Sequence, residues 1–213
     1  MLKEKDNKKI WVTNGMIILC LILFVAFPTS NIFQKMVAYA TFLVVIPMLY
    51  VKIVLKENLK SYGVQKGDWK RGIIFGGASL LLSLAIFYFL LHYTNFLSQY
   101  SLSLIVTGKF LYFALYEIFL VGFFVLIYEL FFRGFVMFSF APSAKYWSVA
   151  VQFLLFVTFL FFIGGLQWSL IYYIIVAPLA GITAYYSRSL IYSLLADWIF
   201  IVIADSLVIK MLK

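Results

Sequence analysis

Apolar residues run along this chain in blocks that are too long for the core faces of a soluble domain. Seven such blocks, separated by short polar segments, lie at residues 10–29, 35–55, 72–93, 107–138, 147–164, 167–186 and 189–209. An α-helix needs about 20 apolar residues to cross a bilayer. The pattern therefore predicts an all-α, polytopic transmembrane helix bundle of about seven spans.

Composition supports a membrane protein. Of the 213 residues, 65% are hydrophobic and only 12% are charged, whereas soluble domains are nearer half apolar and a quarter charged. The first block lacks a small-x-small cleavage site, so we expect a retained helix and not a signal peptide. The abundance of Phe, Tyr, Ile and Lys suits an AT-rich bacterial genome. We therefore expect a multi-pass protein of the bacterial cytoplasmic membrane.

The distribution of Lys and Arg predicts the orientation. With the N-terminus inside, thirteen of the 17 basic residues lie on the inner side and four on the outer side, as the positive-inside rule requires. The net charge of +9 then reflects topology and lipid headgroups, and no nucleic-acid motif accompanies it.

The same pattern divides the chain into three parts. We expect two N-terminal transmembrane helices over 1–55, a basic cytoplasmic loop over 56–71 and a helical core over 72–213. We interpret the loop as a solvated connector. The alternative is a docking surface for a partner or for anionic lipid.

Five charged residues lie more than three positions from the ends of the apolar blocks: Glu117, Glu129, Arg133, Asp197 and Asp205. Charge in a bilayer is costly, so each is a candidate for a functional role. Glu129 and Arg133 are one helical turn apart and can pair on one face. We interpret them as a structural ion pair that faces the bundle interior.

Helical rise places two of these carboxylates at one level. Glu129 and Asp197 each lie about 12–14 Å from the inner ends of their predicted spans. We therefore expect them to face a shared polar cavity. Glu117 lies about 16 Å nearer the outer side, where it would line the same cavity or pair with a hydroxyl such as that of Thr158.

The chain has few residues that bind zinc. His92 is its only histidine and Cys20 its only cysteine, so no site built on several His or Cys ligands is possible. Glu129 and Asp197 supply two ligands where a catalytic zinc takes three from the protein. We expect no metal and no other cofactor.

The stretch "YELFFRG" (128–134) resembles the Glu-Glu-x-x-x-Arg-Gly motif of the CPBP family of intramembrane metalloproteases, which includes the CAAX proteases and is also called Abi. Tyr128, Glu129 and Arg133 occupy the motif positions. The family's second motif, Phe-x-x-x-His, aligns with Phe156 and Leu160.

The third motif of the family, His-x-x-x-Asn, aligns with Asp197 and Ile201. The resemblance implies that the first motif Glu activates water and that the His and Asn residues hold a metal or an oxyanion. Here Tyr128, Leu160 and Ile201 stand at such positions. Leucine and isoleucine cannot bind a metal, and tyrosine is a poor base at neutral pH. We therefore predict a catalytically degenerate member, a pseudoenzyme.

Three functions stay open at this point. The first is a CPBP-like protein that binds a membrane protein or peptide partner, in a regulatory or bacteriocin-immunity-like role. The second is an active intramembrane endopeptidase that processes membrane, prenylated or leader peptides, with zinc or with Glu129 and Asp197 as an acid–base pair. The third is a small transporter or ion-pathway protein with a relay of carboxylates.

Overall fold

A computed structural model describes residues 2–100, 104–164, 167 and 170–212. Every regular element in these ranges is a helix, which confirms the all-α prediction. Segments with a wider or a tighter turn than an α-helix are labelled η. In chain order the elements are α1 (Leu2–Ala26), α2 (Ile32–Ala40), η1 (Thr41–Val45), α3 (Ile46–Leu49), η2 (Tyr50–Val54), η3 (Leu59–Tyr62), α4 (Trp69–Tyr93), α5 (Phe96–Gln99), α6 (Leu104–Gly108), α7 (Phe110–Leu115), η4 (Tyr116–Val121), α8 (Gly122–Tyr128), η5 (Glu129–Met137), α9 (Phe138–Ala144), α10 (Trp147–Gly164), α11 (Ile171–Ser187) and α12 (Leu190–Leu212).

Within the described residues, five helices are long and apolar enough to cross a membrane: Lys9–Ala26, Ile32–Val54, Trp69–Tyr93, Phe110–Ala144 and Trp147–Gly164. Two of them join several elements into one continuous rod, α2 to η2 in the second and α7 to α9 in the fourth. The sixth predicted span corresponds to the shorter apolar helix α11 and the seventh to α12. The count of seven and the inside N-terminus stay predictions.

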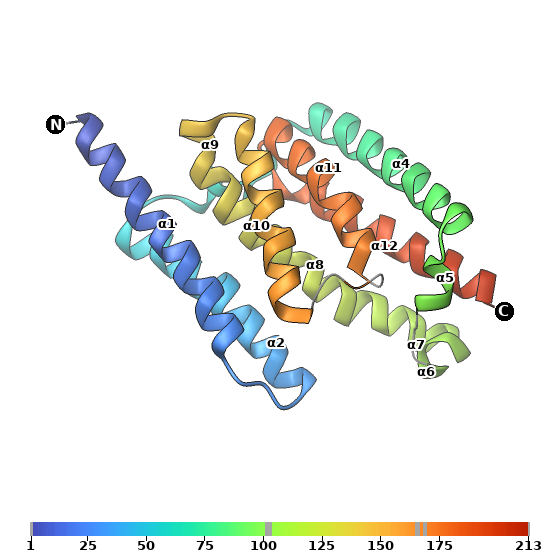
Figure 1. The fold of residues 1–213 in the computed structure, drawn as a ribbon. Helices are drawn as coiled ribbons and strands as arrows, with labels where there is room; N and C mark the ends of the chain where they lie inside the picture. Colours follow the sequence, from blue (N-terminus) through green and yellow to red (C-terminus); the bar gives the residue numbers. More distant parts are fainter. Residues whose placement is uncertain (1, 101–103, 165–166, 168–169, 213) are drawn as a thin grey trace.

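The helices form one elongated bundle (Figure 1). Helices α1 and α2 lie together at one edge, α4 lies at the opposite edge, and α10, α11 and α12 lie between them. One apolar core cluster joins α1 and the 32–54 helix to η5 and α10. A second cluster joins α4, α5, α11 and α12 to the first half of the 110–144 helix. That helix therefore belongs to both cores.

A stripe of small residues lets α4 approach α11 and α12 closely. Gly72, Gly76, Ser79 and Ser83 recur three or four residues apart and are buried, an arrangement common where membrane helices pack tightly. A Cβ atom added at Gly72 would lie 2.3 Å from the ring of Tyr192 on α12. The contact therefore requires glycine at this position.

The basic loop is docked on the turn between α11 and α12. The amide of Asp68 donates to the carbonyl of Ser187 at 2.8 Å, and the amide of Leu190 donates to the carbonyl of Gly63 at 3.0 Å. Gly67 has a φ of +59°, and a Cβ there would lie 2.2 Å from the Ser187 carbonyl oxygen. Most side chains of the loop are exposed, as expected for a solvated connector. The loop also contributes backbone hydrogen bonds to the turn that begins α12, which the sequence did not predict.

We expect Gly72→Ala to destabilise the bundle by about 1–3 kcal/mol, because the added methyl group overpacks the contact between α4 and Tyr192. Gly77→Ala on the same helix is the matched control. Its Cβ meets nothing within 4 Å, so it should be neutral or slightly stabilising, since alanine favours helix over glycine. Thermal unfolding of the two variants in detergent measures the difference. Equal midpoints would contradict the close approach.

Candidate functional site

Glu129 and Arg133 lie in a wide helical segment in the centre of the fold, at its first and middle residues. They belong to η5, a nine-residue π-helical segment inside the 110–144 helix, and π segments in α-helices occur frequently at functional sites. The Arg133 Nη1 lies 3.2 Å from Glu129 Oε1. The predicted ion pair is therefore present.

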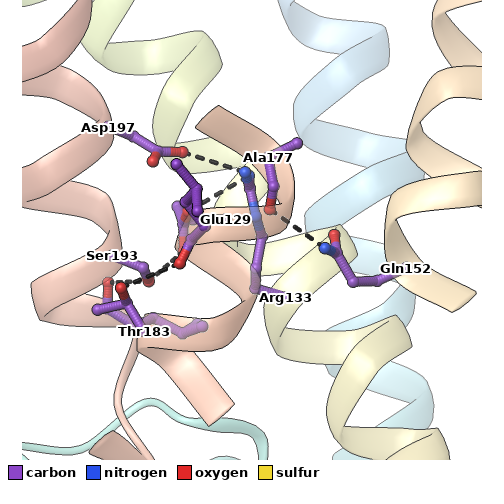
Figure 2. Close-up of polar contacts among 9 residues, drawn as sticks. Glu129, Arg133, Gln152, Ala177, Thr183, Ser193 and Asp197 are labelled. Atoms are coloured by element: carbon purple, nitrogen blue, oxygen red, sulfur yellow. Dashed lines mark hydrogen bonds and ion pairs between the residues drawn. The ribbon is translucent and has the colours of Figure 1, made fainter. Parts of the chain in front are cut away.

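Helix α12 supplies the other half of the site (Figure 2). Arg133 Nη2 donates to Asp197 Oδ2 at 3.1 Å, and the hydroxyl of Ser193 donates to Glu129 Oε2 at 2.7 Å. The expected proximity of Glu129 and Asp197 is thus observed, because both carboxyl groups contact the single guanidinium of Arg133. We call Glu129, Arg133, Ser193 and Asp197 the buried charge cluster.

Its members are closed off from solvent, which corrects the expectation of a shared polar cavity. The exposed fractions of Glu129, Arg133 and Asp197 are 0%, 2% and 2%. The guanidinium fills the space between the two carboxyl groups, and its Cζ lies 5.7 Å from the ring centroid of Phe156. The Arg133 guanidinium can occupy this space because it is planar and presents a fork of donors that two carboxylates can share.

This arrangement does not fit a zinc ion. A cation between Glu129 and Asp197 would need the place that the Arg133 guanidinium occupies. Within the described residues, no group of three or more His, Cys, Asp or Glu side chains is placed to hold a metal. The cluster can instead hold a proton, since one guanidinium and two carboxyl groups are neutral together only with one proton added.

The other motif positions carry packed side chains. The hydroxyl groups of Tyr128 and Tyr39 lie 3.2 Å apart, and the Phe156 ring centroid is 5.3 Å from that of Tyr128. Leu160 belongs to the first core cluster and Ile201 to the second. The fold therefore does not bring the aligned motif positions together as one polar site.

A second acidic pair lies farther along α12. Glu117 and Asp205 are close enough for their carboxyl groups to interact electrostatically, and the Tyr100 hydroxyl donates to Asp205. The expected pairing of Glu117 with Thr158 is wrong, because the Thr158 hydroxyl donates to the Leu154 carbonyl at 2.8 Å. Glu117 and Asp205 are 3% and 1% exposed, so this pair is also internal.

His92 stands apart from both acidic groups. It is exposed near the end of α4, where its Nδ1 lies 2.9 Å from the Tyr88 carbonyl oxygen. It therefore takes no part in the candidate site.

Two polar residues of the interior were not foreseen. Ser193 lies one turn before Asp197, and this spacing on one helix face was a usable signal. Gln152 on α10 is fully buried and donates its amide to the Ala177 carbonyl at 3.2 Å (Figure 2). It lies one turn before Phe156, and only the tertiary contact with α11 gives it a partner.

We expect Arg133→Met to destabilise the protein by about 3–5 kcal/mol, because it leaves two buried carboxyl groups without their counter-charge. Arg71→Met is the matched control. Arg71 pairs with Asp68 at 3.3 Å with 62% of its side chain exposed, and such pairs contribute about 0–1 kcal/mol. Thermal or denaturant unfolding in detergent gives both values.

Adding Glu129→Gln and Asp197→Asn to Arg133→Met should restore most of the lost stability, since the cluster is then uncharged. A loss for Arg133→Met as small as that for Arg71→Met would contradict the assignment of a buried network.

Comparisons with known protein families, with curated proteins and with solved structures find no match to this chain. The resemblance to the CPBP family therefore stays a prediction that rests on the motif residues alone.

Proposed function

We propose that this chain is a membrane protein with a CPBP-like, catalytically degenerate scaffold, and that it acts by binding an apolar segment of a membrane partner. The observation that carries the proposal is the closed state of the buried charge cluster. Glu129 and Asp197 are both held by Arg133, and hydrolysis needs a carboxylate that can reach a water molecule and a substrate.

The residues at the aligned motif positions support the same conclusion. Tyr128, Leu160 and Ile201 are less than 8% exposed and lie among apolar side chains. A side chain that fills a core cannot at the same time present a ligand to a metal or a reacting atom. What persists from the motif is the part that joins η5 to α12.

A lateral groove offers a place for the partner. It has a volume of about 330 Å³ beside η5 and α12, and the docked loop borders it. Its apolar lining includes Leu126, Leu130, Leu190, Ile191 and Leu194, and Glu129 lies at its base. A groove of this size and chemistry suits the apolar side chains of a peptide.

A photo-crosslinking residue at Ile191 tests the groove. In membranes of the source cell we expect it to yield a discrete adduct with a partner protein or peptide. Ile199 is the matched control, because it lies on the same helix and is 44% exposed against 45% for Ile191. Adducts of equal yield at both positions, or none at Ile191, would count against the groove as the binding surface.

Hydrolysis is tested separately with the purified protein and apolar membrane-segment peptides. We expect no cleavage above the background of a Glu129→Gln variant, because the carboxyl group is paired and buried. Cleavage by the wild type that disappears in Glu129→Gln would overturn the non-hydrolytic proposal and favour the endopeptidase.

A proton pathway is the second candidate function. The observation in its favour is that α12 carries two acidic pairs eight residues apart, about 12 Å along the helix axis, each completed by the 110–144 helix. Against it, Val121, Val125 and Ile201 are buried in the apolar cluster between these levels. Proton flux in liposomes that is lost with Glu117→Gln would favour this candidate over the first.

A further inference from the structure

A polar pocket of about 360 Å³ lies at the end of the bundle where the basic loop docks. Four segments that are distant in sequence form it: the 9–14 part of α1, the 57–65 part of the loop, α9, and Arg188 between α11 and α12. Its volume falls in the range of small-molecule sites. It meets the lateral groove proposed above only at Gly63 and Gln65, and the inference does not depend on that proposal.

The charge of the pocket is positive. Among the described lining residues, Lys9, Lys60 and Arg188 are basic and Glu57 is the single carboxylate. Glu57 already has partners, because it forms an ion pair with Lys9 and accepts a hydrogen bond from the Tyr62 hydroxyl at 2.7 Å. In the part of the chain that the structure describes, Lys60 and Arg188 make no ion pair. A net charge of +2 therefore faces the cavity.

Glu57 acts as an anchor within the pocket. Burial by itself would raise the pKa of the Glu57 carboxyl, but the hydrogen bonds from Lys9 and Tyr62 and the Lys9 charge together lower it. Burial and the neighbouring Glu57 raise the pKa of the Tyr62 hydroxyl, which keeps it a donor. The anchor thereby fixes α1 to the loop and holds the pocket walls in place.

The pocket lies near the ends of three candidate membrane spans, at the boundary between the bilayer and the solvent. The apolar part of α1 begins at Lys9, the second candidate span ends at Val54 just before Glu57, and the third begins at Trp69. Apolar side chains of Ile10, Phe138 and Pro142 complete the lining. Basic groups beside apolar walls at this depth match a ligand with a phosphate group and a short apolar or glycerol portion.

We infer that this pocket binds a phosphate ester, held by Lys60, Arg188 and Lys9. A phosphate monoester carries close to two negative charges at neutral pH, which balances the pocket, and its oxygens accept charge-assisted hydrogen bonds from ammonium and guanidinium groups. The hydroxyl of Ser139, which also lines the cavity, is a further donor. The same chemistry occurs in a lipid headgroup and in a soluble phosphate ester.

The test uses the full-length protein in neutral detergent, with the unfolding midpoint followed during titration at constant ionic strength. The probes are sodium glycerol 1-phosphate and, separately, mixed micelles that contain phosphatidylglycerol, with phosphatidylcholine as the neutral control. We expect a saturable rise in the midpoint. Saturation by one probe only identifies the source of the phosphate, and saturation by both supports the shared chemistry.

The double variant Lys60→Gln/Arg188→Gln should weaken apparent binding by about tenfold or more, which corresponds to 1.4 kcal/mol per factor of ten. The matched control is Lys66→Gln/Lys70→Gln, which removes two charges of the same region outside the pocket and should leave binding within about twofold, because exposed charges are screened by salt. Equal loss in the two double variants, or no saturable binding of either probe by the wild type, would overturn the inference.

Glu57→Gln tests the inference through an expected gain in binding of the phosphate probe. It removes the only carboxylate among the described lining residues, so their net charge rises to +3, while the amide oxygen of Gln can still accept a hydrogen bond from Tyr62. We expect tighter binding of the phosphate probe that saturates the wild type. Weaker binding with an unchanged unfolding midpoint in the absence of the probe would contradict the proposed role of the charge.

Discussion

A guanidinium held between two buried carboxyl groups is the constraint on which the centre of this protein depends. Arg133 contacts Glu129 on its own helix and Asp197 on α12, so one side chain joins two long helices. Each of these charges is costly to remove from water, and the cost is offset only while all partners are present. The packing around the cluster must therefore exclude both water and alternative partners.

The aromatic interior meets this requirement. Phe132 and Phe156 have ring centroids 5.0 Å apart and Tyr128 lies beside both, so rings cover the cluster on the side of α10. The 110–144 helix contributes to both core clusters, and the charged residues lie where it passes from one to the other. Any loosening of the charge network is therefore expected to affect both halves of the bundle.

The charged side chains in the interior and those at the membrane boundary differ in whether they have partners of opposite charge. Inside the bundle, Glu129, Arg133 and Asp197 pair with one another and are almost fully buried, and Glu129 also borders the lateral groove. At the end where the loop docks, Lys60 and Arg188 line an open pocket without a counter-ion in the described residues. The interior charges thus join helices to one another, whereas the boundary charges lie beside a cavity.

The sequence by itself determined the helical class, the candidate spans and the Glu129–Arg133 pair, because hydropathy and the helical repeat act over neighbouring residues. It also placed Asp197 at the level of Glu129. Only the tertiary structure decided that Arg133 bridges the two carboxyl groups and closes the expected cavity, that Leu160 and Ile201 lie in separate cores, and that the basic loop docks on the turn before α12. These outcomes depend on which faces of distant helices meet, and no local pattern encodes that choice.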